Sequence, residues 1–524
     1  MLDVAHEALV NLLQPGTMLY LCLGVAIGTV LGILPALGGL AGMSMLLPFI
    51  FGMDPTEGLA LLVGMFAITA TSDTFPSVLL GVPGSSASQA TVLDGYPLAR
   101  QGRGAEALAA GLFSSMLGGI FGALVMFFAI FSARPIILAF GSPELFLLTL
   151  LGLSMVALLS KGSMRLGLMA GAIGLLLGSI GGAPTHPVYR FSFDQIYLFD
   201  GIPLAVLAIG MFAIPELIDL LVEKRSVAGM NKIEGSVFRG MRSTVRNPGL
   251  VARSSAIGAF IGILPGLGGS IGHWLAYGVA AQTSKNRRNF GKGDVRGVIA
   301  SESANNATEG GALIPTLMFG IPGSGSMAIL LGGFTLMGLQ AGPSMVTTDL
   351  SVSVSIAWML AIANILACGV CLILARQIAR ITVLPAELFT PFLFVMLFVA
   401  SYQASRQWGD IIALIAFGLV GWVMKQIGVP RPPLLIGFVL SEPAERYLWT
   451  SMGTYGYSWL WHPMVIAIAA VIVLLLWFGL RVSRRAEETE AIVEAGVDGV
   501  DGGRPGAVVS PPDRDEDRGR DTRS

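Results

Sequence analysis

Long apolar segments recur along most of this chain, and they constrain its fold more than any other feature. Examples are Phe113–Phe131, Ile202–Ile214 and Met464–Leu480. A helix that crosses a bilayer needs roughly 20 mostly apolar residues. Composition agrees, because 54% of the 524 residues are hydrophobic and only 12% are charged, against about 25% in a soluble domain. The sequence therefore predicts an all-α polytopic membrane protein.

An internal duplication divides this apolar region into two related halves. Residues 27–39 read IGTVLGILPALGG and residues 257–269 read IGAFIGILPGLGG, with nine of thirteen positions identical at an offset of 230. A second pair, GVPGS at 81–85 and GIPGS at 320–324, follows at an offset of 239. Because the pairs occur in the same order, they indicate a repeated structural unit.

The repeat and the composition together predict how the chain is divided. The expected segments are an amphipathic N-terminal segment (1–15), a first transmembrane repeat (16–222), a cytoplasmic basic linker (223–249), a second transmembrane repeat (250–448), an extra C-terminal transmembrane helix (449–481) and a disordered tail (482–524). The tail is polar and lacks apolar periodicity, which is typical of disorder.

Charge in the connecting loops predicts that the two repeats have opposite orientations in the membrane. The loop after the first ILPALGG segment, GMDPTEG, is acidic, whereas its counterpart SKNRRNFGKGDVR is strongly basic. After the GVPGS segment comes the basic LARQGRG, but LQAGPSMVTTD after GIPGS holds no Lys or Arg. Since Lys and Arg gather on the cytoplasmic side, equivalent loops face opposite sides. Inverted repeats with broken helices, re-entrant hairpins and a cytoplasmic C-terminus are expected.

The GVPGS and GIPGS segments are expected to form the tips of two re-entrant hairpins. Gly and Pro interrupt helices, and interrupted segments at matching places in two halves are the best sequence indication of a transporter's binding site. A new helix should begin after each tip, and its free N–H groups would bind a carboxylate. The candidate substrate-binding residues are Gly84, Ser85, Ser86, Gly323, Ser324 and Ser326. The alternative is a pair of tight turns with serine caps.

Unusually polar segments, ITATSDTFPS and SESANNATEGG, lead into the two hairpins. Hydroxyls, amides and carbonyls suit a hard cation such as Na⁺, and a carboxylate at membrane depth is a default functional candidate. The candidate cation-coupling residues are Thr69, Ser72, Asp73, Asn305, Asn306 and Thr308; Glu302 and Glu309 lie in the same polar segment. Na⁺ or a proton is the expected coupling ion, with no other metal and no prosthetic cofactor. Hydrogen bonding between helices is the structural alternative.

Other function classes find little support in the sequence. No nucleophile elbow, zinc-protease motif or Walker A motif occurs, so neither an enzyme nor an ATP-hydrolysing subunit is expected. The net charge of −1 shows no footprint for nucleic acid. Cys22, Cys368 and Cys371 lie in apolar segments and are expected to pack as small hydrophobic residues. A membrane scaffold and a channel stay open as alternatives to a transporter of small organic anions.

Three blocks resemble one known family. They are the ILPALGG and ILPGLGG pair, TSDTFPSVLLGVPGSSASQATVLDGYPLARQGRG, and SANNATEGGALIPTLMFGIPGSGSMAILLGGF. Together they resemble the large membrane subunit of the tripartite tricarboxylate transporter family over about residues 1–480. The resemblance implies ion-driven secondary uptake of citrate-like or other carboxylates across a bacterial inner membrane. It also implies two partners, a small membrane subunit and a periplasmic solute-binding protein.

Overall fold

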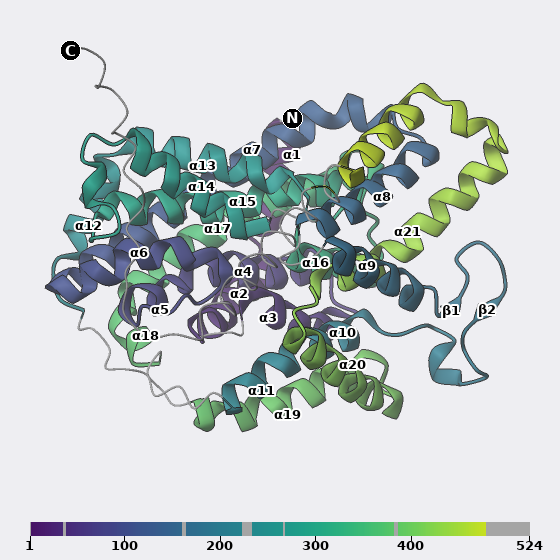
Figure 1. The fold of residues 1–524 in the computed structure, drawn as a ribbon, viewed down its shortest axis with the longest axis horizontal. Helices are drawn as coiled ribbons and strands as arrows, with labels where there is room; N and C mark the ends of the chain where they lie inside the picture. Colours follow the sequence, from purple (N-terminus) through teal and green to yellow (C-terminus); the bar gives the residue numbers. More distant parts are fainter. Residues whose placement is uncertain are drawn as a thin grey trace, which may run out of the picture.

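The fold is almost entirely helical (Figure 1). It was obtained as a computed structural model and describes residues 2–34, 38–159, 164–222, 233–265, 268–381, 386–477 and 481. Within these residues, five helical stretches are long and apolar enough to cross a membrane. The predicted all-α polytopic membrane fold is confirmed. The predicted tail and residues 223–232 of the basic linker lie outside the described residues.

The first half runs through eleven α-helices with short 3-10 and π segments between them. These are α1 (Leu2–Leu12), α2 (Pro15–Ile33), α3 (Gly38–Leu46), α4 (Pro55–Ser72), α5 (Thr74–Leu79), α6 (Gln89–Leu98), α7 (Gly104–Leu138), α8 (Ser142–Leu159), α9 (Met164–Gly178), α10 (Leu204–Ala208) and α11 (Ile214–Val222). A 3-10 helix, Ser86–Ser88, leads into α6, and a π-helix, Ile209–Ala213, joins α10 to α11.

The second half follows a similar order of helices. They are α12 (Val237–Val245), α13 (Pro248–Ile263), α14 (Gly268–Thr283), α15 (Val295–Phe319), α16 (Gly325–Leu336), α17 (Leu350–Ile373), α18 (Ala375–Ile381), α19 (Ala386–Ser405), α20 (Trp408–Gln426) and α21 (Pro432–Tyr455). A further apolar helix, Pro463–Trp477, comes after α21 and packs on α8 through Val465 and Leu147.

Glycines let the first helices of each half approach very closely. A Cβ added at Gly28 of α2 would lie 2.5 Å from the Met65 carbonyl oxygen of α4. In the second half, a Cβ at Gly258 of α13 would lie 2.2 Å from the Ala304 carbonyl oxygen of α15. These residues match at the two repeat offsets, so both halves use the same close backbone packing, for which small residues are needed in membrane helices.

The two halves exchange packing partners symmetrically. Helix α7 packs along α15, and its counterpart α17 packs along α4. Near the lower edge of Figure 1, α11 of the first half lies with α19 and α20, and on the right α21 of the second half lies with α8 and α9. One continuous apolar core includes residues of both halves. Each half therefore depends on the other for its folded structure.

Two regions differ from the sequence expectation in detail. The extra C-terminal helix was expected over 449–481, but α21 continues to Tyr455 and the further apolar helix begins at Pro463. The connection after α9 forms a small β-hairpin, β1 (Gly181–Gly182) with β2 (Tyr189–Arg190). Arg190 fixes it to α21 by a bidentate ion pair with Glu445, at 3.0 and 2.8 Å. The ion pair joins residues that are far apart in the sequence, so no local sequence pattern could predict it.

Candidate functional site at the two hairpin tips

The first hairpin consists of α5, a turn and α6. Gly81 takes a left-handed conformation with φ of 70°, and the Val82 amide donates to the carbonyl of Pro76 at 3.4 Å. Ser85 then caps the 3-10 helix: its Oγ accepts from the Ala87 amide at 3.1 Å, and Ser88 Oγ accepts from the Ser85 amide at 3.3 Å. The tip thus has the serine-capped turn that the sequence analysis gave as the alternative to an anion site.

The second hairpin repeats this geometry between α15 and α16. Gly320 ends α15 with φ of 66°, and the Ile321 amide donates to the carbonyl of Pro315 at 3.1 Å. Ser324 caps α16 by accepting from the Met327 amide at 3.3 Å. Both hairpins therefore place a serine and a glycine at the N-terminal end of a helix.

Each tip lies against the broken helix pair of the other half. A Cβ built on Gly39, at the start of α3, would lie 2.8 Å from Thr69 Oγ1 and 4.0 Å from Ser326 Oγ. The 3-10 helix Ser86–Ser88 in turn packs on α14, which begins after the second break. The structure thus brings a predicted anion-binding serine, Ser326, beside a predicted cation residue, Thr69.

The two tips differ in charge. Ser85 Oγ donates to Asp73 Oδ2 at 2.5 Å, and a Cβ on Gly84 would lie 2.6 Å from Asp73 Cβ. At the repeat offset of 239, the residue that matches Asp73 is Ala312, which faces Gly323 in the same way. An acidic side chain, 1% exposed, therefore stands under the first tip and an apolar one under the second.

The other predicted cation residues each form hydrogen bonds of their own within the helical core. Asn306 Nδ2 donates to Thr71 Oγ1 at 2.7 Å and to Asn364 Oδ1 at 2.6 Å. Asn305 Nδ2 donates to the Ala70 carbonyl at 3.0 Å. The hydroxyls of three others bond backbone carbonyls: Thr69 to Phe66 (2.8 Å), Ser72 to Gly28 (3.4 Å) and Thr308 to Ala304 (2.7 Å).

The orientation of the Asn306 amide follows from its neighbours. Asn364 Nδ2 donates to the Leu360 carbonyl at 2.8 Å, so Asn364 must accept through Oδ1. Asn306 then donates through Nδ2, which leaves its own Oδ1 buried without a hydrogen-bond partner among the described residues. Such an oxygen is costly to bury unsatisfied and is the kind of ligand a hard cation takes.

Three carboxyl groups, those of Asp73, Glu302 and Glu309, are buried in the helical core near Asn306. Asp73 is close enough to both Glu302 and Glu309 for their charges to interact. Asp73 Oδ1 and Glu309 Oε2 have no hydrogen-bond partner among the described residues. Within the same residues, no group of three or more His, Cys, Asp or Glu side chains is arranged to hold a metal ion. An ion held here would need hydroxyl, amide and backbone oxygens as well.

Sequence reasoning missed several polar residues that the fold brings to this region. Thr91 and Ser115 donate to Glu302, at 2.6 and 2.9 Å. Thr71 and Asn364 hold Asn306. Asn364 is an amide within the apolar helix Leu350–Ile373. A single amide in an apolar helix is the sequence feature that could have identified it as a site residue. The partners themselves are 58 to 235 residues apart in sequence, so no local pattern joins them.

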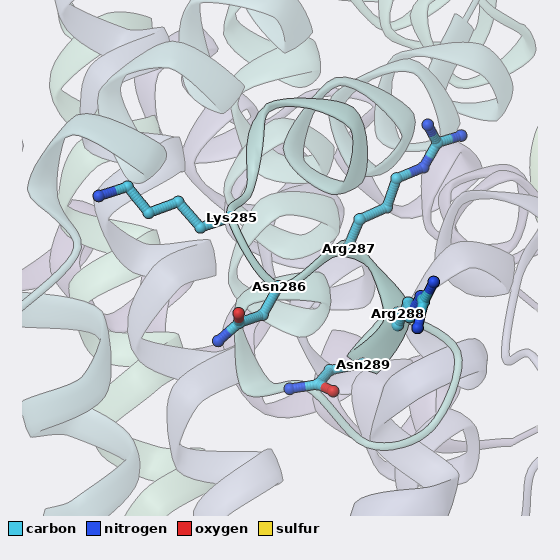
Figure 2. A pocket seen from close by; sticks show the side chains of 5 residues that line it. All are labelled: Lys285, Asn286, Arg287, Arg288 and Asn289. Atoms are coloured by element: carbon cyan, nitrogen blue, oxygen red, sulfur yellow. The ribbon is translucent and has the colours of Figure 1, made fainter.

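A separate pocket of about 650 Å³ lies at the surface between α14 and α15. Figure 2 shows the five residues that line it, with the long basic side chains spread apart rather than directed toward one point. The lining residues are Lys285, Asn286, Arg287, Arg288 and Asn289. All five are exposed, so this loop is a solvated basic surface and not an enclosed binding site.

The fold and the paired hairpin tips define a class, a multi-pass membrane protein with polar interruptions inside its helical core. Residues 18–436 match the family model described as "Tripartite tricarboxylate transporter TctA family". The chain belongs to this family, and the family implies that it is a membrane subunit of a transporter with further subunits.

Two relatives come from Agrobacterium vitis. An uncharacterized 52.8 kDa protein in the TAR-I ttuC′ 3′ region is 30% identical over 486 residues, which is 92% of this chain and 97% of the relative. An uncharacterized protein in the TAR-II ttuC′ 3′ region is 32% identical over 195 residues, which is 37% of this chain and 81% of the relative. No solved structure matches the chain.

Proposed function

We propose that this chain is the permease subunit of an ion-gradient-driven secondary transporter that imports small carboxylates, citrate-like tricarboxylates or related di- and monocarboxylates, across a bacterial inner membrane. A periplasmic solute-binding protein delivers the substrate, and a small membrane subunit completes the transporter. The observation that carries the proposal is the crossing of two capped hairpin tips with the broken helices of opposite halves. Family membership supports the tripartite assembly.

The proposed anion site lies at the two tips. It consists of Gly84, Ser85 and Ser86 in the first half and Gly323, Ser324 and Ser326 in the second. Free N–H groups at a helix N-terminus favour a carboxylate, and each charge-assisted hydrogen bond contributes roughly 1.5–3 kcal/mol. Beneath the second tip lies Ala312, an uncharged residue, where Asp73 lies beneath the first.

Asp73 supplies the proposed coupling between anion and cation. Its carboxylate accepts the Ser85 hydroxyl that would otherwise be available to the substrate. Two like charges in a desolvated space repel strongly, so an anion can approach the first tip only when a cation or a proton neutralises Asp73. Binding of one then favours binding of the other, which is the thermodynamic basis of symport.

Uptake into proteoliposomes that hold both membrane subunits tests the proposed function. Purified binding protein and radiolabelled citrate are added outside, and the Na⁺ and pH gradients are varied separately. We expect accumulation above the outside concentration, dependent on the binding protein and on one gradient. A scaffold would give no uptake, and a channel would equilibrate citrate without accumulation; either result contradicts the proposal.

Asn306→Ala should raise the ion concentration needed for half-maximal uptake about 3- to 10-fold, equivalent to roughly 0.7–1.4 kcal/mol. The reason is loss of the buried Oδ1, which has no partner among the described residues. Thr71→Val is the matched control, since it removes a hydrogen-bond partner of Asn306 but leaves that oxygen in place. Equal ion dependence in wild type and Asn306→Ala would assign Asn306 to packing alone.

Inverted orientation of the two repeats predicts which surface each loop occupies. Arg100 and Gln340 are exposed residues that follow the first and second hairpins. In a variant without its three native cysteines, Arg100→Cys should react with an impermeant maleimide only from the cytoplasmic side and Gln340→Cys only from the periplasmic side. Labelling of both positions from one side would rule out inverted repeats.

A further inference from the structure

Glu302 holds the second arm of the first hairpin in place. It lies on α15 and is fully buried, above Gly111 of α7, where an added Cβ would lie 3.5 Å from Glu302 Cγ. Its Oε1 accepts from Thr91 Oγ1 of α6 at 2.6 Å, and its Oε2 accepts from Ser115 Oγ of α7 at 2.9 Å. The carboxyl group on α15 therefore connects α6, the second arm of the hairpin, to α15 and α7 of the core.

An ionised Glu302 would have no ion-pair partner among the described residues. Among the described residues, no Lys or Arg forms an ion pair with it; Arg103 is paired with Glu106 and Arg296 with Asp294. Besides Glu302 itself, the titratable and charged residues on α15 and on the elements packed against it are Glu57 (α4), Asp73 (between α4 and α5), Asp94 and Tyr96 (α6), Glu106 and Arg134 (α7), Arg239 and Arg242 (α12), Arg253 (α13), His273 and Tyr277 (α14), Arg296 and Glu309 (α15), and Cys368 and Cys371 (α17).

The hydroxyls around Glu302 can serve either protonation state. Thr91 Oγ1 is also 2.8 Å from Ser301 Oγ, and either atom can be the donor; Ser301 Oγ is 3.0 Å from the Gly297 carbonyl. With Glu302 ionised, Thr91 donates to the carboxylate. With Glu302 protonated, its O–H donates to Thr91, which donates to Ser301, which donates to Gly297. Hydroxyls allow this reversal because each is both donor and acceptor.

Helix packing alone does not require this arrangement. At the repeat offset of 239, the residues that match Glu302 and Thr91 are Val63 and Leu330. Both are buried in the main apolar core, and there α16 packs on α4 as α6 packs on α15. The second hairpin is thus held by aliphatic side chains where the first is held by a carboxyl group and hydroxyls, which sets the first hairpin apart as the one sensitive to charge.

We propose that Glu302 carries a coupling proton and that its ionisation releases the first hairpin from α15. This inference rests on the proposed function and specifies its coupling ion. The carboxylate takes a proton from water on the periplasmic side, and the protonated, neutral form keeps α6 docked. On the cytoplasmic side the O–H bond breaks and the proton passes to water. An ionised Glu302 near Asp73 is unfavourable in the closed core, so α6 moves away and admits water.

The test uses proteoliposomes with both membrane subunits, the binding protein, citrate and an internal pH dye. In the wild type, citrate entry should acidify the lumen, and an inwardly directed proton gradient should drive accumulation. Glu302→Gln should lower accumulation at least tenfold and reduce the protons that enter per citrate. Citrate counterflow should fall as well, because a side chain that cannot ionise keeps α6 docked, whereas citrate should still stabilise the folded variant against thermal unfolding. Glu302→Asp should restore proton entry in part, which a purely structural carboxyl group would not do.

Thr91→Val provides a second variant in which the ionisable group is retained. It should transport more slowly and still acidify the lumen with the wild-type number of protons per citrate. Unchanged proton entry in Glu302→Gln, or wild-type uptake driven by Na⁺ with no lumenal acidification, would overturn the inference while the proposed function stands. Absence of both uptake and counterflow in the wild type would instead contradict the proposed function itself.

Discussion

Replacing Gly84 by Ala is expected to reduce uptake about 5- to 150-fold. The new Cβ would lie 2.6 Å from Asp73 Cβ, 3.0 Å from Asp73 Cα and 3.1 Å from the Asp73 carbonyl oxygen, far inside the 3.5–4.0 Å of a normal carbon contact. Two of these three atoms are backbone, so the tip must move away. Overpacking costs typically about 1–3 kcal/mol, which corresponds to the fold-change given.

Gly323→Ala is the matched control for this prediction. At that position the added Cβ would lie 3.2 Å from Ala312 Cβ and 3.5 Å from the Gly262 carbonyl oxygen, so a shift of a few tenths of an ångström accommodates it. Uptake by this variant should stay within about twofold of wild type, equivalent to roughly 0.4 kcal/mol. Initial rates of citrate uptake, normalised to the amount of inserted protein, measure both. Equal damage at the two positions would contradict the proposed difference between the tips.

The sequence predicted the helical framework well where apolar runs ended at turn residues. Gly81 and Gly320 adopt the positive φ that a tip requires. Because they belong to the motifs GVPGS and GIPGS, the two hairpins could be predicted from the sequence. Helix α15 is continuous from Val295 to Phe319 and so passes through the polar residues 301–311. The side chains of these polar residues bond within the core, so the helix reaches the GIPGS tip unbroken.

The composition of the site was less predictable than its location. The contact between Asp73 and Ser85 spans 12 residues and depends on how sharply the chain turns at Gly81. The amide pair of Asn306 and Asn364 depends on α15 and α17 lying together. Gly119 of α7 makes room for that pair, since a Cβ there would lie 2.2 Å from Asn364. Such contacts follow from helix packing, which the one-dimensional pattern does not encode.

The difference in charge between the two tips leads to the last prediction, that Asp73→Asn separates anion binding from the coupling ion. In the wild type, a neutralising cation or proton must accompany the anion at the first tip, because the Asp73 carboxylate stands beside Ser85. An Asn side chain is permanently neutral and its Oδ1 can still accept from the Ser85 hydroxyl. Citrate should therefore stabilise the variant against thermal unfolding at every pH and Na⁺ concentration.

Transport measurements on Asp73→Asn should show a loss of gradient-driven accumulation. Without a charge at position 73, anion binding no longer depends on the ion, so the gradient has no free energy to transfer. Accumulation driven by either gradient should fall by more than tenfold, a coupling loss of at least roughly 1.4 kcal/mol. Ala312→Asn, at the matching position under the second tip, controls for the amide itself and should leave the ion dependence of binding as in wild type. If citrate stabilises Asp73→Asn only when the ion is present, the coupling charge lies elsewhere, and Glu302, the proposed proton carrier, whose charge also interacts with that of Asp73, becomes the residue to replace.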